Sequence, residues 1–402
     1  MDVLQHIKGD KTIWAIIAAL AIFSFLPVYS ASTNLVYVVA KASTTTSGYL
    51  IKHGVLLLFG FIIIYVTHKV PFRYFSGLAV IMMPIVWILL AYTLFQPNED
   101  KNAIMAARWI SLPFVSFRFQ TSTLATVILM IYIARYFAKN KDKEIKFQQS
   151  LLPLWLPVVI VTSLILPANF STAFLLFAMV IVLAFFANYP IKYLVVIGVA
   201  GIVGILLFVL VVKAFPDQFK NTRVQTWINR VDNFSNVKSK SSDQSHKAQV
   251  AIYSGGMTGK GPGKSVQKNF LPQSSSDFIY AIIVEEYGFL GALLLLSMYL
   301  LLLFRIVKVA SKTESIFGTL VVLGLGVPIV FQALVNMAVA VGLFPVTGQT
   351  LPLISAGGTS IWMTCFAFGI ILSVSASEEN DSKEIEDRET ENPLDVLHEA
   401  IG

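Results

Sequence analysis

The sequence predicts an all-α polytopic membrane protein of about ten transmembrane helices, with a large extracytoplasmic loop between helices 7 and 8. Three observations support this: 56% of the 402 residues are hydrophobic, only 13% are charged, and the mean hydropathy is +0.72. A charged share about half the usual one cannot cover a water-soluble surface. Disordered, collagen-like, disulfide-framework and small secreted classes are excluded. The single Cys365 has no partner for an intrachain disulfide or a cysteine-based metal cluster.

Ten apolar segments approach or reach the roughly 20 residues that a helix needs to cross the hydrocarbon core. The turn Pro167-Ala168-Asn169 alone separates the fifth from the sixth, and Pro328 predicts a tilt or kink in the ninth. The first follows Lys8 and Lys11 and is long enough to stay as an anchor. The segments span approximately residues 12–31, 50–67, 76–95, 121–138, 151–167, 170–188, 191–214, 278–304, 315–343 and 353–375.

Basic residues in the short connections predict the orientation in the membrane. The connections after spans two, four, six and eight all carry lysine or arginine, and they lie on the same side as the N-terminus. We expect that side, and with it both termini, to be cytoplasmic. The loops 31–48, 96–120, 215–277 and 344–352 then face outward. The basic residues concerned are Lys69, Arg73, Lys139, Lys141, Lys143, Lys146, Lys192, Arg305, Lys308 and Lys312.

The net charge of +7 divides unevenly along the chain. Residues 378–402 hold ten acidic and two basic residues and carry −8, which leaves +15 for residues 1–377. We expect 1–377 to form the ten-helix membrane domain and 378–402 an acidic, disordered cytoplasmic tail. A basic body points to nucleic acid or anionic lipid as a partner. No nucleic-acid motif is present, which favours lipid.

The outer loop 215–277 has nine Lys or Arg against four Asp, and it contains two kinds of sequence. Residues 233–247, rich in Ser, Lys, Asn and Gln, predict a solvated linker. Residues 255–265 read Gly-Gly-Met-Thr-Gly-Lys-Gly-Pro-Gly-Lys-Ser. This run either presents backbone N–H groups and charge to a phosphate or forms a flexible turn. A nucleotide-binding P-loop is excluded because Thr258 stands where the opening glycine is required.

Three carboxylates at the start of the eighth span are candidate chemical groups. Asp277 stands at the outer helix start, where it is either an N-cap or a general base for a substrate hydroxyl. Glu285 and Glu286 lie eight and nine residues further on, roughly 12–13 Å deeper along a helix. Charged groups at that depth are expensive, so they face a polar cavity, pair with cations, are protonated or lock helices by hydrogen bonds.

Residues 344–360 interrupt the apolar sequence between the ninth and tenth spans with two prolines, three glycines and five hydroxyl side chains. Irregular backbone at membrane depth survives only against protein or a wet cavity. We therefore expect a re-entrant or site-forming turn.

These motifs together resemble the SEDS family (shape, elongation, division and sporulation) over the chain to about residue 377. The run 348–355, Gly-Gln-Thr-Leu-Pro-Leu-Ile-Ser, is similar to the division branch, FtsW, rather than the elongation branch, RodA. A RodA-type role in elongation stays open. The resemblance rests on ten spans with a long loop after the seventh, Arg108-Trp109-Ile110, and the runs 255–263, 271–272, 277–281, 285–288 and 336–360.

The resemblance implies a peptidoglycan glycosyltransferase that polymerises lipid II into glycan strands for septal wall synthesis by an inverting transfer, with Asp277 as general base. It implies a class B penicillin-binding transpeptidase and other divisome membrane proteins as partners, and a multi-pass location in the inner membrane at the septum. It also allows a divalent cation such as Mg²⁺ or Mn²⁺, although the sequence holds no visible metal cage. The implied substrate-binding residues are Arg108, Arg118, Lys260, Lys264, Glu285, Glu286, Thr347, Ser355 and Ser360.

Several positions depart from the family pattern. Thr123 and Thr126 stand where the family has glutamate and lysine, and Asn169 falls in a run that normally carries aspartate. Charges of the family's cavity are therefore missing, and we expect compensation elsewhere. Two other functions stay open: a lipid II flippase or transporter using Glu285 and Glu286 as a polar path, and a non-enzymatic division scaffold.

Overall fold

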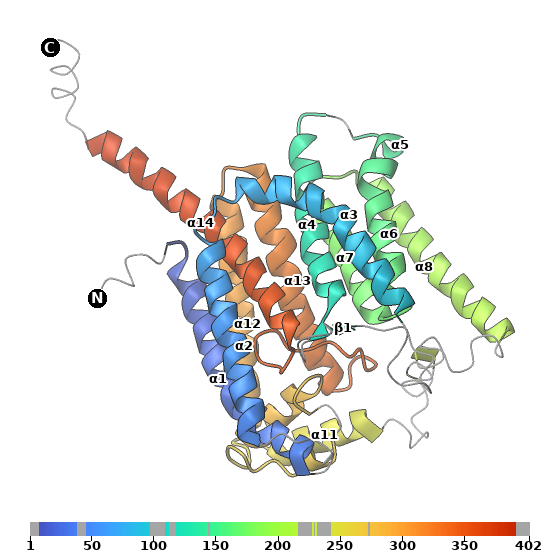
Figure 1. The fold of residues 1–402 in the computed structure, drawn as a ribbon, viewed down its shortest axis with the longest axis vertical. Helices are drawn as coiled ribbons and strands as arrows, with labels where there is room; N and C mark the ends of the chain where they lie inside the picture. The colour runs from blue at the N-terminus through green and yellow to red at the C-terminus, as the bar shows by residue number, and fades with distance from the viewer. Residues whose placement is uncertain are drawn as a thin grey trace.

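The computed structural model describes residues 8–37, 46–96, 109–111, 118–143, 145–215, 227–228, 230, 243–271 and 274–390, and these form a bundle of long helices (Figure 1). Within these ranges nine helical stretches are long and apolar enough to cross a membrane, and α7 is a shorter apolar helix. The predicted all-α polytopic class is confirmed.

The ten predicted spans all occur as helices. The fifth is composite, because Pro153 lacks the N–H that a regular α-helix needs, and one π-helical turn joins two α-helical pieces. The spans are α1 (Lys11–Tyr37), α2 (Thr46–Thr67), α3 (Arg73–Phe95), α4 (Thr121–Lys139), α5 (Phe147–Ser150) with the π turn Leu151–Trp155 and α6 (Leu156–Ile165), α7 (Phe170–Phe186), α8 (Ile191–Ala214), α12 (Ile279–Lys312), α13 (Ile316–Ala340) and α14 (Thr359–Thr390).

Short elements lie in the loops predicted to face outward. The strands β1 (Ile110–Ser111) and β2 (Arg118–Phe119) pair antiparallel just before α4. Helix α11 (Asp243–Gly255) precedes the glycine-rich run and takes up the last five residues of the expected linker. The rest of that linker, residues 233–242, lies outside the described residues.

The tenth span begins later than the sequence suggests. Its helix starts at Thr359 rather than near residue 353, because Leu353 and Gly358 adopt positive φ angles of 64° and 56°, which an α-helix does not allow. The preceding residues therefore belong to an irregular turn, as expected for 344–360. At its other end α14 runs on to Thr390, so residues 378–390 are helical where the sequence suggested disorder. Residues 391–402 lie outside the described part.

Both ends of the described chain meet at one end of the bundle. The Gly9 N–H donates to Glu379 Oε2 at 3.3 Å and the Asp10 N–H to Ser375 Oγ at 3.0 Å. The Asp10 carboxylate also forms an ion pair with Arg305 of α12. Helix α11 lies at the opposite end (Figure 1). This is the arrangement expected of an even number of spans.

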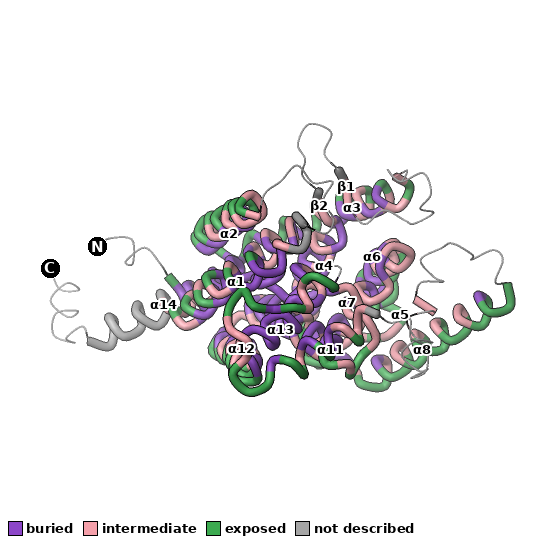
Figure 2. Tube along the Cα trace, turned by 90° about the horizontal axis from the view of Figure 1, so that it is seen from below, coloured by how far each residue is buried: buried purple, intermediate pink, exposed green. Residues whose placement is uncertain are grey.

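The distribution of buried and exposed residues is typical of a protein embedded in lipid. Buried residues gather at the centre of the bundle, while α2, α8 and α12 turn exposed residues outward (Figure 2). On α8 the exposed side chains include Val195, Leu206 and Leu210, which suits contact with lipid tails. Small residues bring α2 and α14 together: a Cβ on Gly60 would lie 2.7 Å from Cys365 Sγ. Cys365 is thus a buried packing residue.

Candidate functional site

Asp277 lies two residues before the first residue of α12. The N-cap position is Phe278, not Asp277, so the N-cap interpretation misplaces the helix start by one residue. The Asp277 side chain is partly exposed and lines a cavity of about 280 Å³. The cavity is enclosed by α4, α7, α13, the start of α14 and the turn 344–358. Asp277 is its only ionisable residue among those that the structure describes.

The cavity changes from polar to apolar with depth. Along each of four helices, the lining residue nearest the Asp277 end carries a hydroxyl or amide group and the deepest one is apolar, although on α14 Thr364 follows Met363. Such a gradient suits a ligand with a polar head and a hydrocarbon chain. The polar and apolar lining residues are Thr123 and Met130 on α4, Thr172 and Met179 on α7, Gln332 and Leu325 on α13, and Ser360 and Ala367 on α14.

The backbone around Asp277 is clamped against the turn 344–358. Asn336 of α13, which is only 1% exposed, donates from Nδ2 to the Asp277 carbonyl at 2.8 Å and to the Gln349 carbonyl at 2.7 Å. Ser355 donates from Oγ to the Ser276 carbonyl at 2.6 Å, and the Ala356 N–H donates to Ser275 O at 2.9 Å. An irregular turn is therefore present at 344–358, and it fixes the backbone position of Asp277.

The three positions that depart from the family pattern all face this cavity. Thr123, Thr126 and Asn169 are among its lining residues. Each of these positions therefore places a neutral polar side chain at the cavity wall. Asn169 also has a local role, since its side chain accepts from the Thr172 N–H at 3.4 Å and caps α7.

Sequence reasoning missed Arg230. This residue is half-buried, and its Nη1 donates to the Val346 carbonyl in the turn at 3.1 Å. Burial lowers the pKa of its guanidinium below the ordinary value, and the Asp277 carboxylate acts in the opposite direction. Arg230 is therefore a cation in the electrostatic neighbourhood of Asp277. In the sequence it is one of nine basic residues in a long loop, and nothing distinguishes it from the others.

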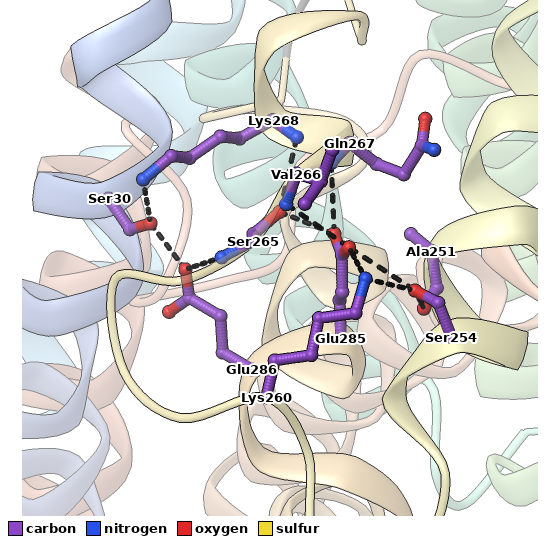
Figure 3. Close-up of polar contacts among 10 residues, drawn as sticks. All are labelled: Ser30, Ala251, Ser254, Lys260, Ser265, Val266, Gln267, Lys268, Glu285 and Glu286. Carbon is purple, nitrogen blue, oxygen red and sulfur yellow. Dashed lines mark hydrogen bonds and ion pairs between the residues drawn. The ribbon is translucent and has the colours of Figure 1, made fainter.

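Glu285 and Glu286 lie in a separate, closed network (Figure 3). Glu285, 0% exposed, forms an ion pair with Lys260 Nζ at 2.6 Å. It also accepts from the Val266 N–H at 3.1 Å and from the Ser265 hydroxyl. Neither carboxylate nor Lys260 lines the Asp277 cavity.

Glu286 joins three parts of the chain. It accepts from the Ser30 hydroxyl of α1 and from the Ser265 N–H at 3.3 Å. Lys268 in turn donates to Ser30 Oγ at 3.2 Å. The two glutamates therefore tie the glycine-rich loop to α12 and α1, a helix-locking arrangement. A contact of either glutamate with substrate stays a prediction.

The glycine-rich loop completes a break in α12. Gly288 has φ 68° inside the helix, which frees backbone groups on either side. The loop satisfies them: the Lys260 and Gly261 N–H groups donate to the carbonyls of Glu285 and Glu286 at 3.0 and 2.9 Å, and the Phe289 N–H donates to Gly256 O at 2.9 Å. A Cβ on Gly288 would lie 2.4 Å from the Gly259 nitrogen. The glycines are needed for this close backbone approach.

The remaining predicted site residues are spread over the outer end. Ser360 lines the cavity, and Trp109, beside Arg108, does too. Thr347 is half-buried in the turn, and Lys264 is exposed. Arg118 pairs with Ser111 through the backbone of β2. Arg108 lies outside the described residues.

The described residues offer a poor donor set for a metal ion. No group of three or more His, Cys, Asp or Glu side chains comes together among them, and the cavity presents a single carboxylate. Ca²⁺ takes about six to eight oxygen ligands, whereas Mg²⁺ can be held by one or two carboxylates together with substrate phosphates. The single carboxylate therefore suits only a metal ion that also binds the substrate. We derive no chemical step through a metal.

The fold and the cavity define a polytopic membrane protein with one carboxylate site at the end of its bundle opposite the termini. The model of the cell cycle protein family FtsW/RodA/SpoVE matches residues 10–380, and the chain belongs to this family. A protein of Geobacter sp. (strain M18) named probable peptidoglycan glycosyltransferase FtsW is 31% identical over 92% of this chain and 98% of its own length. One of the same name from Enterococcus hirae is 28% identical over 96% and 98%.

Solved structures share the fold. A chain from a structure titled "Structural coordination of polymerization and crosslinking by a peptidoglycan synthase complex" aligns with a TM-score of 0.71 and 25% identity, over 92% of this chain and 98% of that one. The rod shape determining protein RodA of Thermus thermophilus aligns with a TM-score of 0.65 and 23% identity, over 92% and 97%. The similarity to RodA shows only that the two chains share a fold.

Proposed function

We propose that the chain is a peptidoglycan glycosyltransferase of the division type, which polymerises lipid II into glycan strands for the septum. The observation that carries the proposal is the Asp277 carboxylate in a cavity whose other described lining residues are neutral. The polar-to-apolar gradient of that cavity suits a lipid-linked saccharide, and the FtsW relatives bear the name of this activity.

Asp277 acts as the general base of an inverting transfer. The 4-hydroxyl oxygen of the acceptor GlcNAc attacks the anomeric carbon of the donor sugar, and its proton passes to the Asp277 carboxylate. The bond from the anomeric carbon to the phosphate oxygen breaks, and the electron pair leaves with the polyprenyl pyrophosphate. A carboxylate is a weak base, so the proton moves as the new glycosidic bond forms.

Arg230 is the described cation best suited to the leaving group. A guanidinium offers paired donors to phosphate oxygens and stays charged at neutral pH. Its bond to the Val346 carbonyl holds it beside the turn that also holds Asp277. The expected alternatives are less well placed: Lys260 is engaged by Glu285, and Lys264 is an exposed residue of the glycine-rich loop, whereas Arg230 contacts the turn that lines the cavity.

The working partners follow from the same proposal. Lipid II and the growing glycan strand occupy the outer face, and a class B penicillin-binding transpeptidase and other divisome proteins bind the membrane domain. The synthase-complex structure among the similar chains supports a transpeptidase partner. We place the protein in the inner membrane at the septum, with both termini cytoplasmic.

The transporter hypothesis is disfavoured by the glutamate network. A polar path needs groups that a moving headgroup can reach, but Glu285 and Glu286 are buried and accept from loop and α1 donors. A scaffold without catalysis is separable by experiment, because it needs no carboxylate at Asp277.

The test is lipid II polymerisation by the purified protein in detergent, with and without its transpeptidase partner, read as glycan products on a gel. We expect Asp277→Asn to lower the rate by at least about 100-fold, the scale of a lost general base. Ser297→Ala is the matched control, since Ser297 is exposed and donates only within its own helix to Leu294 O at 2.8 Å.

Unchanged thermal midpoints would show that both variants fold. Glycan polymer from Asp277→Asn at the wild-type rate would refute the assignment. Growth supported by Asp277→Asn in cells depleted of the wild-type protein would favour the scaffold hypothesis instead.

A further inference from the structure

A second cavity opens at the end of the bundle opposite Asp277. The residues that flank α4 mark the two cavities: Gln120 before it lines the Asp277 cavity, and Asn140 after it lines this one. Its volume is about 640 Å³. The α4–α5 connection, the α7–α8 turn and the start of α13 enclose it, and in Figure 1 these segments lie at the end away from α11. The loop charges predict this end to be cytoplasmic.

Among the described residues that line this cavity there are four lysines and no carboxylate, and Asp142 lies between two of these lysines in the chain. Lys141, Lys143 and Lys146 come from the α4–α5 connection and Lys192 from the first turn of α8. All four are exposed, and among the described residues none forms an ion pair with an acid. Converging ammonium groups repel one another. The site therefore favours an anion.

Another cavity at the same end of the bundle differs from the lysine cavity in its charge balance. It has three basic residues, Arg305 among them, but also Asp10, Glu378 and Glu379, and Asp10 pairs with Arg305. Positive charge on the cytoplasmic side is a general topology signal, yet here the chain neutralises one basic cavity with its own acids. The lysine cavity has no such internal counter-ions among its lining residues.

The lysine cavity also has apolar walls. Phe137 and Leu320 are buried at its base, and Phe186 is 48% exposed at its side. The adjoining Ile191 at the start of α8 is 63% exposed, so an apolar path continues onto the outside of the bundle. The amides of Asn140 and Asn188 line the cavity as neutral groups. A ligand matching this surface carries both a phosphate and hydrocarbon.

We propose that this cavity binds the phosphodiester headgroup of an anionic phospholipid, with an acyl chain lying along Phe186 and Ile191. Basic pockets between transmembrane helices on the cytoplasmic side bind such headgroups. The bound lipid bridges the α4–α5 connection to α8. Few other contacts hold α8 against the bundle, since the buried residues of this helix are only Leu194 and Val212. The proposal is independent of the glycosyltransferase assignment.

The test uses the full-length protein in neutral detergent and native mass spectrometry, titrated with phosphatidylglycerol, phosphatidylcholine or inorganic phosphate. We expect phosphatidylglycerol to bind at least tenfold more tightly than phosphatidylcholine, and binding to weaken as salt rises. The variant Lys143→Gln, Lys146→Gln, Lys192→Gln should lose at least tenfold in affinity.

Two controls keep the outcome decisive. Lys308→Gln, Lys312→Gln removes charge from the neutralised cavity at the same end and should change phosphatidylglycerol binding by less than twofold. The three arginine substitutions at 143, 146 and 192 should retain binding. An equal loss in both glutamine variants would mean diffuse attraction to the leaflet and overturn the site. Inorganic phosphate binding as tightly as the lipid would make a free anion the ligand and overturn the lipid assignment.

Discussion

Asp277 and the pair Glu285 and Glu286 lie only eight and nine residues apart in the chain. The structure gives the two acidic regions opposite environments. Asp277 lines a cavity of about 280 Å³ among neutral polar groups. Glu285 and Glu286 are 0% and 1% exposed and face hydrogen-bond donors from a loop and from α1. A carboxylate in apolar sequence thus signals either chemistry or architecture, and the surrounding donors decide which.

The second region supports the first. The glutamates hold residues 256–268 against the break in α12, and the chain leads from there through Leu271 to Asp277. The Ser274 hydroxyl adds a bond to the Ala31 carbonyl at 3.3 Å, so α1 contacts both parts. We therefore expect changes in the glutamate region to alter stability first, and changes around Asp277 to alter the reaction first.

The largest effect is expected at Gly288, where the glycine-rich loop packs against the break in α12. Gly288→Ala places a Cβ 2.4–2.5 Å from backbone atoms of Gly259 and Met257 at a φ of 68°. We expect a loss of at least about 3 kcal/mol in stability, seen as a lower thermal midpoint in detergent or as no folded protein. Gly77→Ala is the control, because a Cβ there meets nothing within 4 Å, and it should be neutral or stabilising by about 0.5–1 kcal/mol. Equal midpoints for the two variants would contradict the broken-helix account.

Most of the fold was predictable because membrane spans need long apolar runs, and all ten runs became helices. The boundaries failed where backbone conformation, not hydropathy, decides. The start of α14 is delayed by the positive φ of Leu353, and apolar sequence carries no sign of that. The sequence does not indicate the break at Gly288 either, since one glycine in an apolar run is compatible with a regular helix.

The candidate site was predictable at its centre and not at its edges. Asp277 and the turn 344–358, each singled out in the sequence, lie together in the structure, and Thr123 and Thr126 line the same cavity. Arg230 and the clamp through Asn336 were missed, because both depend on contacts between segments 59 or more residues apart. Contacts at such separations leave no periodic pattern in the sequence.

The next effect is expected at the centre of the glutamate region. Glu285→Ala removes a buried carboxylate that accepts from Lys260, Ser265 and Val266, and it should cost about 3 kcal/mol. Lys260→Met should cost only about 1 kcal/mol, because the lysine side chain is 32% exposed and the other donors remain. Thermal midpoints in detergent compare the two. A lysine variant as damaged as the glutamate variant would mean that the ion pair, not the hydrogen-bond network, holds the loop.

Asn336→Leu tests the clamp on the Asp277 side. The substitution keeps the number and branching of the side-chain heavy atoms, although the methyl groups are bulkier, and leaves the carbonyls of Asp277 and Gln349 without their bonds from Nδ2, at roughly 1–3 kcal/mol. We expect the polymerisation rate to fall by more than tenfold at temperatures where the variant is folded, because the carboxylate shifts relative to the acceptor hydroxyl. Measuring rate and thermal midpoint together separates the effects. A stability loss with an unchanged rate would show that Asn336 supports the fold without positioning Asp277.

The smallest effect is expected at Arg230. This residue belongs to the same loop as the glycine-rich run, but it contacts the turn beside Asp277. Arg230→Gln removes the cation, and because its amide nitrogen lies two bonds nearer the backbone it also removes the bond to the Val346 carbonyl. We expect about a tenfold slower polymerisation, or roughly 1.4 kcal/mol. Lys264→Gln removes an equal charge from an exposed loop position and should change the rate by less than twofold. Arg230→Lys should recover only part of the rate, since a single ammonium lacks the paired donors of a guanidinium. If Lys264→Gln proves the slower variant, the pyrophosphate lies over the glycine-rich loop, and the glutamate region takes part in substrate binding after all.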